Sequence, residues 1–190
     1  MTPLSALKAA VNEFEKRPLN YCLIGGHAAS LYRRSERLTK DVDFALLTEP
    51  YERARQCAEE VITAIGLTPA IGFFPDHTNR SHKGVVKMIT STPTAGSFTG
   101  IIDVLLPVMP WVADAVQRAQ FNRIDLIFAH VPIITPEDLI IAKAYALNNA
   151  SDRFQDLDDI KEIFGAKLEL DLSYIRMKLE KGETCRDSRQ

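Results

Sequence analysis

Three aspartates are the residues of this 190-residue sequence whose types and spacing could do chemistry. Asp41 and Asp43 are two positions apart, so on a β-strand both project from the same face. Asp103 lies inside the apolar run of residues 100–106, where a buried carboxylate is costly without a partner. Neighbouring carboxylates resist ionising together unless a cation lies between them, and converging oxygen donors suit a hard divalent ion such as Mg²⁺. The pattern therefore predicts a metal-dependent phosphoryl or nucleotidyl transfer site.

Each aspartate also has a purely structural interpretation. Surface strands often carry alternating acids, which would explain Asp41 and Asp43 without a metal. The apolar residues Phe44 to Leu47 favour an internal strand instead. For Asp103 the alternative is a salt bridge to a buried arginine or lysine.

Two consecutive glycines, Gly25 and Gly26, end a short apolar strand from Tyr21 to Ile24. A helix is expected to open directly after them. Glycines let backbone N–H groups approach a ligand closely, and a helix N-terminus favours an anion such as a triphosphate. A tight turn also needs glycines, so the pair alone does not distinguish a turn from a nucleotide site.

The order of the expected strands and helices predicts an α+β fold. It would have a mixed β-sheet flanked by helices and a C-terminal helical appendage. We expect a core over residues 1–134 and a C-terminal helical region over residues 135–190 packed on it. The apolar patterns predict strands near residues 21–24, 41–47, 71–74, 84–90, 99–106, 121–128 and 130–134. The helical region begins with a hydroxyl N-cap at Thr135, a proline at the first helical position and two acids in the first turn.

Composition limits the classes of function. Hydrophobic residues make up 46% of the chain and charged residues 25%, which are ordinary globular values. The net charge of −2 argues against holding nucleic acid by global charge, although residues 33–40 form a local basic cluster. That cluster is either a binding patch or a solvated loop. His77 and His82, with Asp76, hint at a transition-metal site, but a solvated loop is the favoured interpretation.

The cysteines and the hydropathy indicate the compartment. Cys22, Cys57 and Cys185 are scattered, and the first two lie in apolar patterns typical of core packing. A reduced setting follows. Neither a signal peptide nor a membrane-spanning run is present, so we expect a cytoplasmic protein with no membrane partner.

The order of these motifs resembles the nucleotidyltransferase superfamily related to DNA polymerase β. The resemblance rests on the strand and Gly25-Gly26, the stretch Arg37-Leu38-Thr39-Lys40-Asp41-Val42-Asp43, and the distant Asp103. Residues 135–143 and 155–160 are similar to a small bacterial branch that includes abortive-infection toxins. Two departures stand out. Many relatives have Gly-Ser where this chain has Gly25-Gly26, and the branch's arginine before Asp156 is Gln155, with Arg153 two residues earlier.

The resemblance implies roles for individual residues. Asp41 and Asp43 would bind two Mg²⁺ ions that bridge the triphosphate of an NTP substrate. Asp103 would bind the ion that activates the acceptor hydroxyl and would accept its proton. The nucleotide-binding set would be Gly25, Gly26, Ser30 in place of the missing serine, Arg37 and Lys143. Lys143 could instead be a solvated helix lysine. Asp156 and Asp159 could orient Lys143 or cap a helix.

Two hypotheses of function follow. In the first, the protein transfers an NMP from an NTP to a hydroxyl acceptor, with RNA and tRNA in particular favoured, as a toxin–antitoxin component with a cognate antitoxin protein. A small molecule such as an aminoglycoside, or a protein side chain, stays open as the acceptor. In the second, the chain is a non-catalytic member that binds a nucleotide or a partner protein. The absent serine favours the second hypothesis, and the three acids argue against it.

Overall fold

The structure, a computed structural model, describes residues 2–72, 85–92, 101–150 and 152–187. The loop that contains His77 and His82 lies outside these residues. The strands are β1 (Asn20–Ile24), β2 (Asp41–Leu47), β3 (Thr68–Ile71), β4 (Met88–Thr92), β5 (Ile101–Leu105), β6 (Arg123–Leu126) and β7 (Ala129–Pro132). The helices are α1 (Pro3–Phe14), α2 (Gly25–Tyr32), α3 (Tyr51–Ala64), α4 (Val112–Ala119), α5 (Pro136–Asn149), α6 (Phe154–Gly165) and α7 (Leu172–Asp187).

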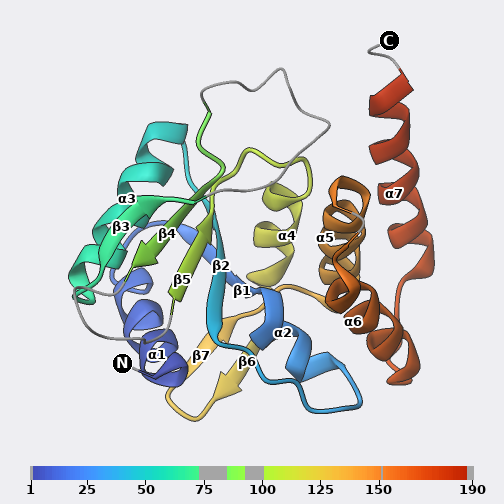
Figure 1. The fold of residues 1–190 in the computed structure, drawn as a ribbon, viewed down its shortest axis with the longest axis horizontal. Coiled ribbons are helices and arrows are strands. Elements are labelled where there is room, and N and C mark those ends of the chain that lie inside the picture. The colour runs from blue at the N-terminus through green and yellow to red at the C-terminus, as the bar shows by residue number, and fades with distance from the viewer. Residues whose placement is uncertain (1, 73–84, 93–100, 151, 188–190) are drawn as a thin grey trace.

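A five-stranded sheet in the order β1-β2-β5-β4-β3 forms the centre of the fold. Strands β2 and β5 are parallel, and the other neighbouring pairs are antiparallel, so the sheet is mixed as predicted. In Figure 1 helices α1 and α3 cover one side of the sheet, α2 and α4 lie on the other, and α5, α6 and α7 lie beyond them. A separate hairpin pairs β6 with β7.

The core explains why the central strands are apolar. Phe14 of α1 stacks on Tyr21 of β1 at 4.8 Å between ring centroids, and Phe44 of β2 packs against both rings. Cys22 and Cys57 are buried and reduced, as their apolar surroundings predicted. Strand β2 lies between β1 and β5, which confirms the internal strand expected for Asp41 and Asp43.

Helices α5 and α2 begin in different ways, and the difference lies in the cap of the first turn. Thr135 caps α5 because its Oγ1 accepts a hydrogen bond from the Asp138 backbone N–H at 3.2 Å, and Pro136 is the first helical residue. Helix α2 begins directly at Gly25, and its N-cap residue, Ile24, makes no side-chain cap. The first backbone donors of α2 are therefore left to partners outside the N-cap residue, and the Gly26 N–H bonds Asp43.

The third strand differs from its prediction. The sequence predicted a strand over residues 71–74, whereas β3 spans Thr68–Ile71 and pairs Thr68 with Thr92. Strand β3 includes Pro69, which is tolerated because β3 is an edge strand, where a missing N–H donor leaves no ladder bond unmade. The remainder of the predicted range, and parts of the ranges 84–90 and 99–106, lie outside the described residues.

The expected boundary at residue 134 falls between β7 and α5. The chain there is still tied to the sheet, because the Ile134 N–H donates to the Leu23 carbonyl oxygen at 3.0 Å. The division into two regions stays a prediction. Among the described residues, the helices are too short or too polar to cross a lipid bilayer.

Candidate active site

The three aspartates meet at one end of the central strands. In the parallel register of β2 and β5, Asp43 is the direct partner of Asp103, and Asp41 precedes Asp43 by two residues on the same face. One carboxylate oxygen of each residue lies within 4.8 Å of the corresponding oxygens of the other two. The predicted convergence is confirmed. It depends on the parallel pairing of two strands that are far apart in the sequence.

The diglycine turn touches this acidic cluster directly. Gly25 has a φ of +65°, and a Cβ atom built on it would lie 1.9 Å from Asp43 Oδ2. A Cβ atom on Gly26 would lie 2.6 Å from Thr39 Oγ1 and 3.3 Å from Arg37 Cζ. A serine at position 26 therefore has no room here, because the Thr39 hydroxyl already fills that space. This accounts for the first departure from the resemblance.

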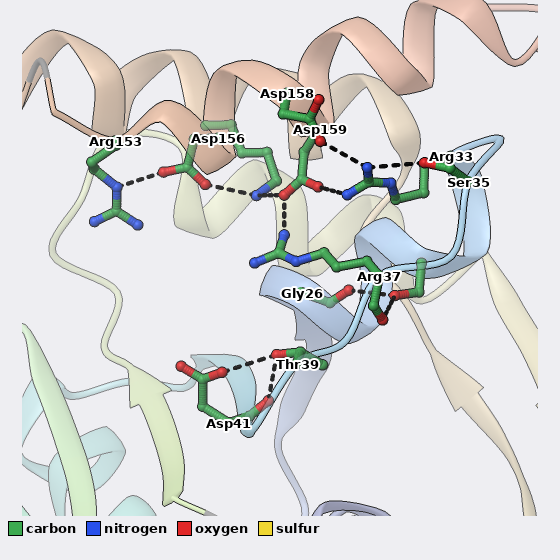
Figure 2. A network of polar contacts seen from close by, with 12 residues as sticks. Gly26, Arg33, Ser35, Arg37, Thr39, Asp41, Arg153, Asp156, Asp158 and Asp159 are labelled. Carbon is green, nitrogen blue, oxygen red and sulfur yellow. Dashed lines mark hydrogen bonds and ion pairs between the residues drawn. The ribbon is translucent and has the colours of Figure 1, made fainter.

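The other predicted nucleotide-binding hydroxyl, that of Ser30, is turned toward the backbone. Its Oγ donates to the Gly26 carbonyl oxygen at 3.0 Å, which is a bond within helix α2. Thr39 is the hydroxyl next to the aspartates, since its Oγ1 donates to Asp41 Oδ1 at 2.9 Å (Figure 2). A role for Ser30 toward a nucleotide stays a prediction.

Electrostatic repulsion in the cluster is visible in the pKa values. Burial, followed by the negative charges of Asp41 and Asp103, raises the pKa of Asp43 to about 7, although the Gly26 N–H and Lys143 favour its ionised form. Burial also raises the pKa of Asp103, against a hydrogen bond that Thr90 Oγ1 donates to Asp103 Oδ1 at 2.5 Å. The cluster therefore favours a bound cation, because a cation would relieve this repulsion.

Lys143 is buried and belongs to an ion-pair network. Only 5% of the residue is exposed, and its Nζ lies 2.8 Å from Asp156 Oδ1 and 2.7 Å from Asp159 Oδ2. The interpretation of Lys143 as a solvated helix lysine is wrong. Of the two roles considered for Asp156 and Asp159, the structure shows the one in which both acids hold Lys143. Arg153 Nε lies 2.5 Å from Asp156 Oδ2, so this arginine pairs with Asp156 although residue 155 is glutamine.

Arginines from the segment after α2 complete the network at Asp159. Arg33 Nη1 donates to Asp159 Oδ1 at 2.6 Å, and Arg37 Nη1 contacts Asp159 Oδ2. Figure 2 shows both arginines, which lie on the segment that follows α2, pointing toward Asp159 of α6. Asp159 is fully buried and forms ion pairs with Arg33, Arg37 and Lys143. These pairs link α5 and α6 to the residues beside the diglycine turn.

The basic cluster at residues 33–40 is therefore largely neutralised. Arg33 and Arg37 pair with Asp159, and Arg34 Nη2 lies 2.9 Å from Glu162 Oε1. The side chains of Arg33 and Arg37 are only 7% and 13% exposed. The interpretation of this segment as a solvated loop is wrong for these two residues. Neither arginine is available as an open patch for nucleic acid.

Three residues at the site were not expected from the sequence. Thr90, which contacts Asp103, belongs to no local motif, and Arg33, which contacts Asp159, was noted only as part of the basic cluster at residues 33–40. The third is His27, in the first turn of α2, whose Nε2 is buried without a hydrogen-bond partner and whose pKa burial lowers. The position of His27 directly after the two glycines was the one available signal.

An acidic triad beside an uncapped helix N-terminus on a mixed sheet defines a site suited to nucleotidyl transfer. Residues 6–188 match the family described as "Nucleotidyl transferase AbiEii toxin, Type IV TA system". The chain belongs to this nucleotidyltransferase family, which confirms the resemblance drawn from the sequence. No curated protein matches the chain in a sequence search.

Solved structures share the fold at low sequence identity. The solution structure of the antibiotic-resistance factor ANT(2'')-Ia matches with a TM-score of 0.62 and 12% identity, over 97% of this chain and 95% of that one. The lincosamide antibiotic adenylyltransferase LnuA matches with a TM-score of 0.54 and 14% identity, over 87% and 99%. A nucleotidyltransferase-like protein from Paracoccidioides brasiliensis gives a TM-score of 0.52 and 14% identity, over 98% and 91%. These matches support the nucleotidyltransferase fold.

Proposed function

We propose that this protein is a Mg²⁺-dependent enzyme that transfers a nucleoside monophosphate from an NTP to a hydroxyl acceptor and releases pyrophosphate. The observation that carries the proposal is the convergence of Asp41, Asp43 and Asp103 within 4.8 Å, beside the turn that begins helix α2. Membership of the AbiEii nucleotidyltransferase family supports the same reaction class.

The donor set fits Mg²⁺. Carboxylate oxygens are the ligands that hard divalent cations prefer, and three of them converge here within 4.8 Å. Asp41, Asp43 and Asp103 would hold the two ions expected. Bound Mg²⁺ supplies charge neutralisation on the triphosphate and increases the acidity of the acceptor hydroxyl.

The nucleotide would lie against the start of α2. Backbone N–H groups of an uncapped helix N-terminus bind phosphate oxygens, and glycines allow the close approach. Arg37 packs over this turn, because its Cζ lies 3.3 Å from the site of a Cβ on Gly26. Lys143 acts electrostatically on Asp43, so its charge lies near the cluster, although Lys143 and Arg37 are also paired with acids of α6. Gly25, Gly26, Arg37 and Lys143 form the proposed binding set, with Ser30 on the same helix.

In the proposed reaction the acceptor oxygen attacks the α-phosphorus in line with the leaving group. The new bond joins the acceptor oxygen to the α-phosphorus, and the bond that breaks joins the α-phosphorus to the oxygen bridging to the β-phosphate. The electron pair leaves with pyrophosphate. Asp103 accepts the proton of the acceptor hydroxyl, a role proposed because its carboxylate lies with those of Asp41 and Asp43 where the metal-bound hydroxyl would be.

RNA, and tRNA in particular, is the acceptor we propose, by analogy with the abortive-infection branch. A basic patch does not support this choice, because Arg33, Arg34 and Arg37 are engaged with acids of α6. The solved neighbours that share the fold include enzymes named for adenylylating a tobramycin and a lincosamide. A small-molecule hydroxyl is therefore the competing acceptor class. The family description also supports a toxin role with a cognate antitoxin protein as partner.

The test is label transfer from each α-³²P-labelled NTP, with Mg²⁺, to total RNA and, in parallel, to a panel of aminoglycosides and lincosamides. We expect labelled RNA with the wild type and a loss of at least about 1,000-fold with Asp43→Ala, since removing a central catalytic group has effects of this order. Label on the small molecules alone would reject RNA as the acceptor, and the proposed NMP transfer would stand.

The non-catalytic alternative is separated by calorimetry with Mg²⁺-NTP on the wild type and on the double variant Asp41→Ala/Asp43→Ala. An enzyme of the proposed kind binds the nucleotide in a manner that depends on both aspartates. Equal binding by the wild type and the double variant, with no label transfer to any acceptor, would reject catalysis.

A further inference from the structure

One row of side chains crosses the sheet at the level of the metal cluster. The register pairs Asp43 of β2 with Asp103 of β5, and Asp103 in turn with Thr90 of β4. Directly paired residues on neighbouring strands present their side chains to the same face. Thr90 is therefore placed beside the cluster by the sheet, on the side of Asp103 away from Asp43.

Thr90 makes a direct contact with the cluster. Its Oγ1 donates to Asp103 Oδ1 at 2.5 Å, a short hydrogen bond of the kind formed with a carboxylate. The next residue along β4 does something different, because Ser91 Oγ is buried and accepts from the Ile102 N–H at 2.7 Å. Thr92 lies on the Thr90 face, but its Oγ1 is directed to the Thr68 carbonyl oxygen of the edge strand.

We propose that Thr90 is a positioning residue, whose hydroxyl holds one oxygen of Asp103 and so keeps this carboxylate turned toward Asp41 and Asp43 for divalent metal binding. The inference rests on the proposed function, in which the three aspartates hold the metal. It assigns a role to a residue of β4, a strand that carries none of the motifs recognised in the sequence.

The physical need for such a donor comes from the crowding of the acids. Asp41 acts on Asp103 as a like charge, so a freely rotating Asp103 side chain would turn away from the cluster in the absence of a cation. The Thr90 hydroxyl opposes that rotation through its 2.5 Å hydrogen bond to Asp103 Oδ1. Thr39 also holds one oxygen of Asp41, since its Oγ1 donates to Asp41 Oδ1 at 2.9 Å. Asp41 and Asp103 thus each have one carboxylate oxygen hydrogen-bonded to a threonine hydroxyl.

The experiment compares Thr90→Val, Thr90→Ser and the matched control Thr92→Val, which makes the same substitution on the same strand and face. The first readout is the dissociation constant for Mn²⁺, measured on each full-length variant by electron paramagnetic resonance without nucleotide or turnover. The second is the pair of kinetic constants for NMP transfer. Loss of a group that orients a metal ligand weakens metal affinity by about 10–100-fold.

We expect Thr90→Val to weaken Mn²⁺ binding in that range, with kcat reduced at saturating metal and the KM for NTP changed less. Thr90→Ser, which keeps the hydroxyl, and Thr92→Val should stay within about threefold of the wild type. Thr90→Ala provides the same reading through a smaller side chain if the valine variant does not fold.

Several results would overturn the proposal. Unchanged Mn²⁺ affinity in Thr90→Val would show that Asp103 needs no donor. Equal weakening in Thr90→Ser would assign the effect to packing, and equal weakening in Thr92→Val would assign it to the strand as a whole. Wild-type protein that binds no Mn²⁺ would reject the proposed function together with this inference. Wild-type binding combined with an unaffected Thr90→Val variant would reject the inference alone.

Discussion

Gly25 and Asp43 approach so closely that a Cβ atom on residue 25 would lie 1.9 Å from Asp43 Oδ2. The Asp43 carboxylate therefore occupies the space that a side chain on Gly25, the first residue of helix α2, would need. This contact joins the segment that would bind phosphate to the residues that would bind metal, and neither can shift without the other.

Gly25→Ala should reduce NMP transfer by about 100-fold, because a displacement of about 1 Å at a reacting centre has effects of that size. The new methyl group would push the Asp43 carboxylate away, and the φ of +65° would add backbone strain. Initial rates at saturating Mg²⁺ measure the effect. Gly66→Ala is the matched control, since its φ is +81° but nothing lies within 4 Å of its Cβ position. Gly66→Ala should lower stability by about 1 kcal/mol and leave activity intact. A fully active Gly25→Ala variant would show that this close approach is not needed.

Asp159→Asn should lower the free energy of unfolding by about 3–5 kcal/mol, which is typical when one partner of a buried ion pair is removed. The substitution would leave Arg33, Arg37 and Lys143 without a full counter-charge in a place that water does not reach. Urea unfolding measures the loss. The neighbouring Asp158 also pairs with Arg33, but its side chain is 59% exposed, so Asp158→Asn should lower stability by less than about 1 kcal/mol. Equal effects of the two substitutions would contradict the central role of Asp159.

The stabilisation that the Asp43 proton gives to the metal-free protein should fall as the pH rises from about 4 to about 7. His27, whose pKa burial lowers, contributes in the opposite direction, because the unfolded state binds its proton more readily. The pKa of Asp43 is raised to about 7 in the folded protein, so between these limits the folded state holds a proton that the unfolded state has lost. The stabilisation linked to that proton is complete below the unfolded pKa and disappears as the pH passes the folded pKa. Each unit of pKa shift corresponds to about 1.4 kcal/mol, which urea unfolding at several pH values can resolve.

Two comparisons check this pH dependence. Asp43→Asn removes the titrating group, so the stability of the wild type should fall more, or rise less, than that of Asp43→Asn between pH 4 and pH 7. Saturating Mg²⁺ should restore stability at pH 7 in the wild type and not in Asp43→Asn, because only the ionised carboxylate binds the cation. Parallel pH dependence of stability in the metal-free wild type and in Asp43→Asn would contradict the raised pKa.

Tyr174→Phe should lower the free energy of unfolding by about 1–2 kcal/mol with NMP transfer unchanged. The Tyr174 hydroxyl donates to Asp138 Oδ1 at 2.7 Å, and hydrogen bonds to charged groups have this order of strength. The variant keeps the ring, which lies 4.1 Å from Arg118 Cζ and ties α7 to α4. Tyr174→Leu should lose more, since it also removes the cation–π contact. A large fall in activity in Tyr174→Phe would show instead that α7 communicates with the site.

Local patterns were enough to predict much of this protein. A period of two places Asp41 and Asp43 on one face, a strand that ends in two glycines turns into a helix, and Thr135-Pro136 starts another helix. Each of these depends on backbone geometry within a few residues, so no distant part of the chain can easily reverse it. The error in β3 arose because its bounds follow from its pairing with β4, which places the strand at Thr68–Ile71 and not at 71–74.

Only the tertiary structure decided which charges meet. Asp159 pairs with Arg33 across 126 residues of sequence, and Lys143, which local pattern could not distinguish from a solvated lysine, is buried between two acids. Thr90 had no signal of its own until the register of β4 and β5 placed it against Asp103. The sequence by itself determined the acidic pair and the glycine turn, because these follow from short-range geometry, and the resemblance of its motifs to a family indicated the class of site. The partners of each charged group came from long-range strand and helix packing, which no periodicity in the sequence encodes.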